Sequence, residues 1–136
     1  MKPIIVIDDD TDDLDMFKEV CADIGVQNQI IAFSDAYDFI DYIKASEEKF
    51  YFILCDVNMA KCSGLELKKI ILADEHLRLK CVPFIFWSTS SASPTIKEAY
   101  SYNVQGYFVK PIGYDNLIKV VQSMVDYWGY SENPNQ

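Results

Sequence analysis

The chain has 136 residues, is 50% hydrophobic and carries a formal net charge of −9, with 12 basic and 21 acidic side chains. This length and hydrophobic content predict one domain with a substantial core, and the shortage of basic residues argues against direct nucleic-acid binding. No apolar run approaches the roughly 20 residues that a membrane span needs, and a strand follows Met1-Lys2-Pro3 where a signal peptide would continue. We therefore expect a cytoplasmic protein without membrane insertion.

The chain opens with four branched apolar residues, IIVI at 4–7, which run directly into three carboxylates, DDD at 8–10. A run in which every position is apolar predicts a strand buried on both faces, so the carboxylates lie at an edge of the sheet. Adjacent carboxylates repel one another unless a cation joins them or they stay solvated at a helix start. The run therefore indicates either a site for a hard divalent cation such as Mg²⁺ or an acidic helix turn capped by Asp10 or Thr11.

Helix signals recur along the rest of the chain. The predicted helices cover residues 14–24, 36–43, 63–74, 93–102 and 117–128. Gly25 supplies a stop for the first helix, and the segment 63–66 (SGLE) has the form of a capping box for the third. Ser93 and Pro94 predict a cap and a first-turn proline for the fourth.

Strand signals alternate with these helices. The predicted strands cover residues 4–7, 29–33, 50–55, 82–87 and 105–109. Five strand–helix units joined by right-handed crossovers predict an α/β, flavodoxin-like fold, which is a doubly wound parallel sheet of five strands with helices on both faces. Residues 1–130 would form this domain, and residues 131–136 a short polar tail.

The cysteines show no metal or disulfide pattern. No Cys-x-x-Cys pair occurs, and Cys55 lies inside an apolar run. We expect reduced, mostly buried thiols at the four positions Cys21, Cys55, Cys62 and Cys81. The single histidine, His76, lies in a charged stretch and is expected at the surface.

Polar side chains follow four of the five predicted strands. Asp8 and Asp9 follow the first strand, Asp56 the third, Ser88 the fourth and Lys110 the fifth. Because the carboxyl ends of parallel strands meet at one edge of a sheet, these side chains are expected to converge. Each residue alone is also typical of an ordinary turn, cap or loop.

The converging groups suit phosphoryl chemistry. Asp56, isolated at the end of a buried strand, is the candidate nucleophile and would become an acyl phosphate. Lys110 would pair with one phosphoryl oxygen, and Ser88 would donate a hydrogen bond to another. Mg²⁺ prefers few carboxylates together with phosphate and water. Its predicted ligands are Asp9, Asp8 through water, Asp56 and the backbone carbonyl of Asn58.

Together these residues resemble the receiver domains of two-component response regulators, over about residues 3–127. In that family an acidic pair follows the first strand, the phosphorylated aspartate ends the third, a Ser or Thr ends the fourth and a Lys-Pro pair ends the fifth. The matching positions here are Asp8-Asp9, Asp56, Ser88 and Lys110-Pro111. The segments 56–59 (DVNM) and 64–67 (GLEL) also look like the family's loop and third helix.

The resemblance implies a signalling switch that is not an enzyme but assists its own phosphorylation and dephosphorylation. It would take a phosphoryl group from a histidine kinase or histidine phosphotransfer protein onto Asp56, with Mg²⁺. Too few residues follow residue 127 to form an output domain. The chain would therefore be a stand-alone receiver, resembling chemotaxis-type regulators or phosphorelay intermediates, and its downstream protein target is unknown.

Tyr107 matches the family's aromatic position that changes rotamer on phosphorylation. Ser88 and Tyr107 would form the switch, because a hydroxyl drawn toward the phosphoryl group vacates space beside the ring. The partner-binding face would comprise the helix at 93–102, the strand at 105–109 and the last helix, with Ile96, Tyr100 and Tyr107 as candidate contacts. The alternative for Tyr107 is an ordinary half-buried strand aromatic.

Some positions depart from the family pattern. Ala60 stands where the family usually has Pro, Ser63 where it often has Asp or Asn, and Trp87 is bulkier than the usual aliphatic residue. Ser88 in place of Thr is conservative. These positions concern loop stiffness, helix capping and packing, so we expect them to alter kinetics more than activity.

Three other functions fit parts of the sequence. A haloacid-dehalogenase-like phosphatase would use Asp8 as nucleophile within Asp8-Asp9-Asp10, but Asp12 stands where that motif has Thr or Val. A receiver that is never phosphorylated and only binds partners is disfavoured because each phosphorylation residue is present. A flavodoxin-like nucleotide binder would need a Gly-rich phosphate loop, which the sequence lacks.

Overall fold

A computed structural model describes residues 1–135 of the chain. Its strands are β1 (Ile4–Ile7), β2 (Ile30–Phe33), β3 (Phe52–Asp56), β4 (Phe84–Ser88) and β5 (Gly106–Val109). They form one parallel sheet in the order β2-β1-β3-β4-β5. The helices are α1 (Thr11–Asp23), α2 (Ala36–Ala45), α3 (Gly64–Ala73), α4 (Glu75–Lys80), α5 (Ser93–Ser101) and α6 (Tyr114–Tyr130). The predicted doubly wound parallel fold is confirmed.

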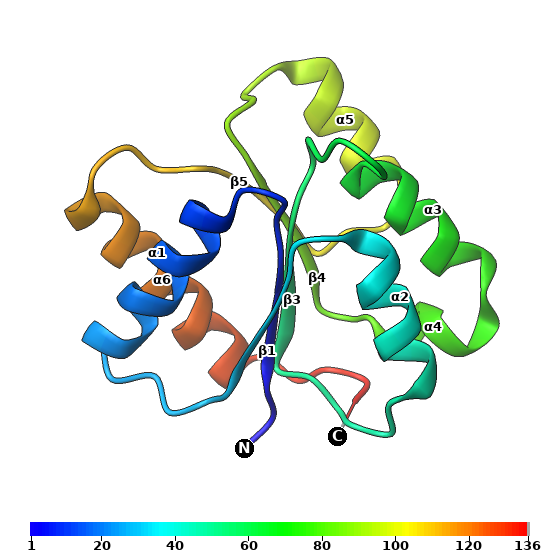
Figure 1. Cartoon of the computed structure of the whole chain (residues 1–136), viewed down its shortest axis with the longest axis horizontal. Helices are drawn as coiled ribbons and strands as arrows, with labels where there is room; N and C mark the ends of the chain where they lie inside the picture. Colours follow the sequence, from blue (N-terminus) through cyan, green and yellow to red (C-terminus); the bar gives the residue numbers. More distant parts are fainter. Residues whose placement is uncertain (136) are drawn as a thin grey trace.

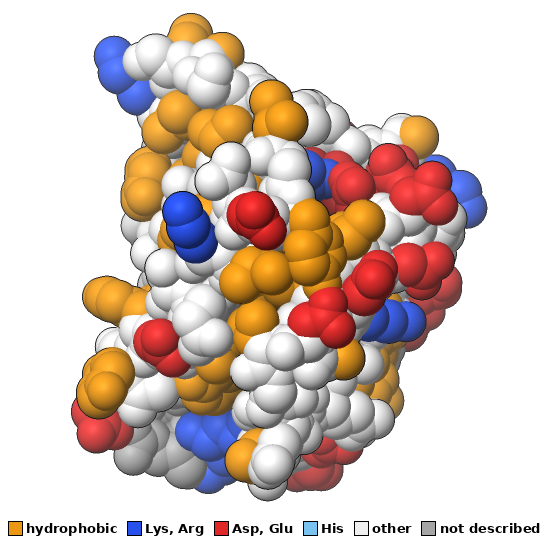
Figure 2. Space-filling model, turned by 90° about the vertical axis from the view of Figure 1, so that its left-hand side faces the viewer, with side chains coloured by type: hydrophobic (Ala, Val, Ile, Leu, Met, Phe, Trp, Pro, Cys, Tyr) orange, Lys and Arg blue, Asp and Glu red, His pale blue; other side chains and the backbone are white. Residues whose placement is uncertain are grey.

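The helices cover both faces of the sheet. Helices α1 and α6 lie on one side, and α2 to α5 lie on the other (Figure 1). On the face covered by α1 and α6, Asp and Glu side chains gather on the part formed by α1 (Figure 2). Within residues 1–135, no helix is both long and apolar enough to cross a membrane.

The central strands are buried because their sequences are continuously apolar. Every residue of β1, β3 and β4 is buried, as expected of parallel strands packed between two helix layers. The four cysteines are buried and His76 is exposed, as predicted. The core therefore fixes the strand ends from which the polar side chains project.

Two local predictions need correction. The charged stretch after α3 forms an additional helix, α4, because Asp74 ends α3 and also caps α4 through the backbone N–H groups of His76 and Leu77. Leu77 then packs into the core. Ser93 is the first residue of α5 and not its cap; Ala92 holds that place without a side-chain hydrogen bond, although Pro94 lies in the first turn as predicted.

The capping box that begins α3 is confirmed. The Ser63 hydroxyl accepts from the Glu66 N–H at 3.1 Å, and the Glu66 carboxylate accepts from the Ser63 N–H at 3.5 Å. This reciprocal pair satisfies two backbone donors that a helix start leaves without partners inside the helix. The capping box also sets the residue at which α3 begins after the loop that follows β3.

Candidate functional site

The strand order brings the predicted site residues together. Strands β1, β3, β4 and β5 are neighbours in the sheet, and they pair in register up to their carboxyl ends. Asp56 pairs with Trp87 across β3 and β4, and Ser88 pairs with Val109 across β4 and β5. Asp8 and Lys110 directly follow β1 and β5. The sheet topology alone therefore places a carboxylate, a hydroxyl and an ammonium side by side.

The acidic run after β1 divides between the two roles that its sequence allows. Asp10 caps α1, because its carboxylate accepts from the Asp12 and Asp13 backbone N–H groups. Asp8 is fully buried and turns into the site. Asp9 is exposed, and its carboxylate accepts from the Ala60 N–H at 2.9 Å. The run is thus a helix start at Asp10 and part of an acidic cluster at Asp8 and Asp9.

This acidic cluster fits a divalent cation. One carboxylate oxygen each from Asp8, Asp9 and Asp56 lies within 4.8 Å of the other two. Two of these residues, Asp8 and Asp56, are buried, where unneutralised like charges are costly. Oxygen ligands at this density suit a hard cation such as Mg²⁺. These distances concern only the carboxylates, so the backbone carbonyl of Asn58 stays a predicted metal ligand.

Lys110 reaches back across the site from the end of β5. Its Nζ lies 2.7 Å from Asp8 Oδ2, 2.7 Å from Asp13 Oδ2 and 3.5 Å from Asp56 Oδ2. The ammonium also lies 5.3 Å from the centroid of the Trp87 ring. The predicted nucleophile and the predicted phosphoryl-binding lysine are therefore adjacent, but the lysine is closer to two other carboxylates.

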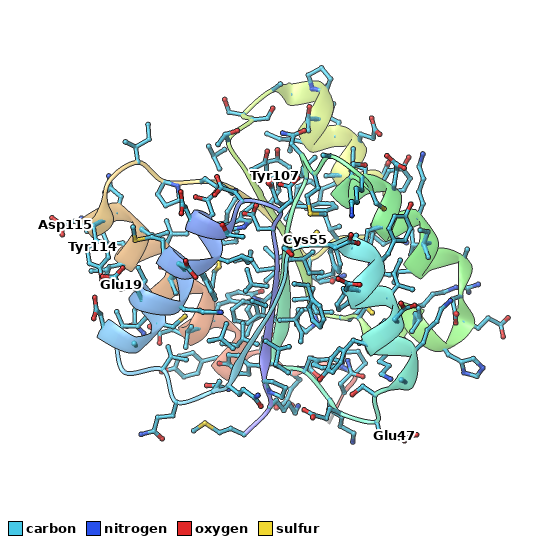
Figure 3. The ribbon with its side chains drawn as sticks, in the orientation of Figure 1. Glu19, Glu47, Cys55, Tyr107, Tyr114 and Asp115 are labelled. Atoms are coloured by element: carbon cyan, nitrogen blue, oxygen red, sulfur yellow. The ribbon has the colours of Figure 1, made fainter. Side chains whose placement is uncertain are left out.

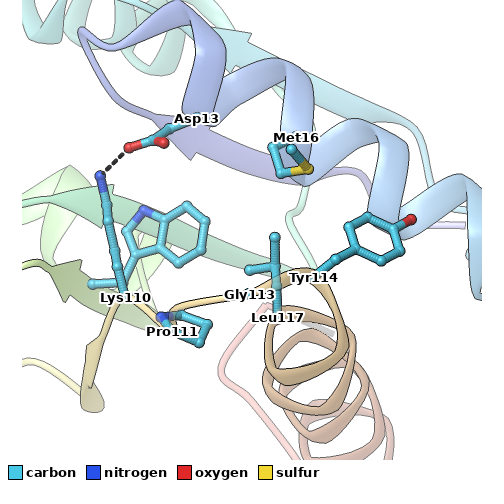
Figure 4. A pocket seen from close by; sticks show the side chains of 8 residues that line it. Asp13, Met16, Lys110, Pro111, Gly113, Tyr114 and Leu117 are labelled. Atoms are coloured by element: carbon cyan, nitrogen blue, oxygen red, sulfur yellow. Dashed lines mark hydrogen bonds and ion pairs between the residues drawn. The ribbon is translucent and has the colours of Figure 1, made fainter.

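Asp13 is a site residue that the sequence analysis missed. It lies in the first turn of α1, and Figure 4 shows its carboxylate directed at Lys110. A signal was available: Asp13 precedes the buried Phe17 by four residues and so shares the apolar face of the helix. A carboxylate on that face has to find a partner, and here the partner is Lys110.

Burial and charge perturb the titration of these groups. Burial, and then the charge of Asp8, raise the pKa of Asp56 to about 6. Burial also raises the pKa of Asp8, although the hydrogen bond from Lys110 opposes this shift. Burial alone would lower the pKa of Lys110, but its bonds to Asp13 and Asp8 outweigh burial and raise it. The ion pairs therefore favour the charged form of Lys110, whereas burial favours the protonated forms of Asp8 and Asp56.

The raised pKa of Asp56 predicts a pH dependence of stability without metal. Folded Asp56 titrates near pH 6 and the unfolded residue near 3.8, so between these values the folded state binds a proton that the unfolded state lacks. Lowering the pH from 7 to 5 should therefore add about 1 kcal/mol to the free energy of unfolding. Urea denaturation in EDTA measures this for wild type and Asp56→Asn. If the free energies of unfolding of the two proteins changed with pH in the same way, the raised pKa of Asp56 would be wrong.

Ser88 and Tyr107 are linked through one loop. The buried Ser88 hydroxyl accepts from the Asn58 side-chain amide at 3.3 Å and from the Ser90 N–H at 3.1 Å. The Tyr107 hydroxyl donates to the Ser90 carbonyl at 2.8 Å, and its ring packs edge-on against Phe86. Tyr107 lies toward the loop that leads to α5, far from Tyr114 at the start of α6 (Figure 3). A movement of Ser88 would therefore act on the loop that holds Tyr107.

Comparison with known proteins agrees with this geometry. The profile of the response regulator receiver domain matches residues 4–122. Chemotaxis protein CheY-3 of Vibrio cholerae is 32% identical over 108 residues, 79% of this chain and 79% of that protein. The probable methanogenesis regulatory protein FilR2 of Methanothrix harundinacea is 24% identical over 136 residues, 96% of this chain and 86% of that protein.

The fold also matches solved structures. The phosphorylated cyanobacterial phytochrome response regulator RcpA superposes with a TM-score of 0.87, at 24% identity and 98% coverage of both chains. Asp8, the nucleophile of the phosphatase alternative, is fully buried, whereas Asp56 keeps a small exposed fraction. The profile match and the CheY-3 identity together show that the chain belongs to the response regulator receiver domain family.

Proposed function

We propose that Asp56 is the phosphoacceptor of this receiver domain. The observation that carries the proposal is the position of its carboxylate, at the end of β3, 3.5 Å from Lys110 Nζ and inside the cluster with Asp8 and Asp9. The Asp56 side chain is 9% exposed, so a donor can approach one side of it. A carboxylate so placed can attack phosphorus while its neighbours hold the developing charge.

The phosphoryl transfer is a displacement at phosphorus. An Asp56 oxygen forms the new P–O bond as the donor's P–N or P–O bond breaks. The electron pair leaves on the imidazole nitrogen of a phosphohistidine or on the carboxylate oxygen of acetyl phosphate. Mg²⁺ bound by Asp8, Asp9, Asp56 and the Asn58 carbonyl would neutralise charge on the phosphoryl oxygens. Lys110 donates to one of these oxygens. In this way the chain's own residues would assist phosphorylation. They would also assist dephosphorylation, in which a water oxygen attacks phosphorus, the Asp56 O–P bond breaks, and inorganic phosphate and the Asp56 carboxylate are released.

The donor class follows from the family. Receiver domains take phosphoryl groups from histidine kinases or histidine phosphotransfer proteins, and we propose the same for this chain. The exposed carboxylates of α1 and the exposed Asp9 leave the entrance to the site acidic. A donor that presents a phosphohistidine must overcome this charge through contacts of its own.

Phosphorylation would be transmitted through Ser88 and Tyr107. The Ser88 hydroxyl still has its own O–H to donate to a phosphoryl oxygen. If Ser88 moved toward that oxygen, the bonds that it accepts from Asn58 and Ser90 would carry the movement to the loop that accepts from Tyr107. The exposed Tyr100 on α5 lies on the face that this change would alter. A target that distinguishes two positions of Tyr107 shifts their populations by its difference in affinity.

Magnesium should stabilise the protein by relieving repulsion in the acidic cluster. At millimolar Mg²⁺ we expect a gain of about 1 kcal/mol in the free energy of unfolding, a few degrees in Tm. Thermal melting of wild type, Asp9→Ala and Asp15→Ala tests this, because Asp15 is an exposed carboxylate elsewhere on α1. The gain should persist in Asp15→Ala and vanish in Asp9→Ala. Equal gains in both variants would exclude this cluster as the metal site.

Intact mass tests the phosphoacceptor. After incubation with acetyl phosphate and Mg²⁺, wild type should gain the mass of one phosphoryl group, and Asp56→Asn should gain none. Asn has nearly the same shape as Asp. Loss of the phosphoryl adduct in Asp56→Asn therefore reports the missing carboxylate and not unfolding. A phosphoryl adduct that persists in Asp56→Asn would overturn the proposal.

A further inference from the structure

We propose that Asp13 is a positioning residue that competes with the phosphoryl group for the Lys110 ammonium, and thereby lowers the stability of the phosphorylated state. This inference rests on the proposed function of Asp56. The ammonium has three N–H donors. Asp8 and Asp13 take two of them at 2.7 Å, whereas Asp56 lies at 3.5 Å, beyond an ordinary N–H···O distance. Lys110 is therefore drawn away from the residue that would carry the phosphoryl group.

The position of Asp13 on α1 suits this role. Its Oδ2 contacts Lys110, and it lies outside the cluster of Asp8, Asp9 and Asp56. The Asp13 side chain is 38% exposed, whereas Asp8 is fully buried. Breaking a buried ion pair leaves an uncompensated charge, but a partly exposed partner is rehydrated at little cost. When Lys110 moves, the Lys110–Asp13 pair is therefore the ion pair that breaks.

The surroundings leave Lys110 room to move. Asp13 and Lys110 line an open pocket of about 250 Å³ between α1 and the start of α6 (Figure 4). The Lys110 side chain is 12% exposed, so part of its surface borders this pocket.

The charges set the direction of the competition. A phosphoryl group on Asp56 carries up to about two negative charges, so it attracts Lys110 more strongly than the Asp56 carboxylate does. Moving toward it costs the Lys110–Asp13 bond. Replacing Asp13 with Asn removes this cost, so the phosphorylated state should become more stable relative to the unphosphorylated state.

Beryllofluoride, a phosphoryl analogue, measures this stability at equilibrium. The experiment titrates beryllofluoride at fixed Mg²⁺ and follows tryptophan fluorescence in wild type, Asp13→Asn, Asp13→Glu and Asp12→Asn. Asp12 lies beside Asp13 in the same helical turn and is exposed, so its variant makes the same charge change without touching Lys110. Asp13→Asn should bind about fivefold more tightly, since a partly exposed pair is worth up to about 1 kcal/mol. Asp12→Asn and Asp13→Glu should stay within about twofold of wild type.

Equal tightening in Asp12→Asn and Asp13→Asn would show a general charge effect, and weaker binding in Asp13→Asn would show that Asp13 aids Lys110; either result overturns the inference. A crystal structure of wild type with beryllofluoride and Mg²⁺ tests it without any variant. There, Lys110 Nζ should lie within hydrogen-bond distance of a fluoride and outside that distance from Asp13. An intact Lys110–Asp13 pair would contradict competition. Wild type that takes up neither beryllofluoride nor acetyl phosphate would instead refute the proposed function itself.

Discussion

Replacing Gly64 with alanine should destabilise the fold by about 3 kcal/mol or more, because an added methyl group has no space. A Cβ at this position would lie 2.3 Å from the Asp56 carbonyl oxygen and 2.7 Å from a Phe86 ring carbon. The nearer atom belongs to the backbone of β3 and cannot turn aside. The Gly64 N–H also donates to the Val57 carbonyl at 2.9 Å, so α3 begins directly against the strand end that carries Asp56.

Gly106→Ala provides the matched control. A Cβ at Gly106 would meet its nearest neighbour at 3.5 Å, an ordinary van der Waals contact. Urea denaturation should place Gly106→Ala within about 0.5 kcal/mol of wild type and Gly64→Ala far below it. If the two variants were equally stable, the close approach of α3 to β3 would be wrong.

Replacing Lys110 with alanine should cost about 3–5 kcal/mol in the metal-free protein, because the substitution leaves buried carboxylates without their cation. Asp8 is fully buried and Asp56 nearly so, and both lie within 4 Å of Lys110 Nζ. Millimolar Mg²⁺ should recover part of the loss, since a cation bound to Asp8 and Asp56 restores positive charge. Phosphorylation of Asp56 should remain possible but lose its effect on the β5–α6 loop.

Lys61→Ala is the control for the lysine substitution. Lys61 forms an ion pair with Asp35 at 3.2 Å, but its side chain is 79% exposed. Solvent screens such an exposed pair, so it contributes little to stability. Denaturation in EDTA and in Mg²⁺ compares the two variants. A loss in Lys110→Ala no larger than that in Lys61→Ala would mean that the site tolerates its carboxylates without the lysine.

Sequence patterns predict most of the architecture because local and global preferences agree. The apolar runs that become β1, β3 and β4 indicate burial on both faces, and their alternation with helices predicts a parallel sheet. Parallel order then determines that Asp8, Asp56, Ser88 and Lys110 meet at one edge. Which polar residues converge is therefore a consequence of topology, and topology is readable from the alternation of elements.

Other features depend on tertiary contacts that no local pattern records. Helix α4 has six residues and forms because Asp74 serves two helices while Leu77 enters the core. The sequence places Asp13 on the apolar face of α1, but its partner Lys110 lies 97 residues away along the chain and is known only from the tertiary structure. In the same way, Ala92 and not Ser93 takes the cap position of α5, although alanine has no side-chain oxygen to accept a capping bond.

If Asp56 accepts the phosphoryl group, chemical mapping should find the modification at that residue. Wild type treated with acetyl phosphate and Mg²⁺ is reduced with borohydride, which converts an aspartyl phosphate into homoserine, and is then digested for peptide mass mapping. Homoserine is expected at position 56, and omission of Mg²⁺ should suppress it. Homoserine at position 8, or its absence from position 56 under conditions where the intact protein carries a phosphoryl group, would contradict the assignment.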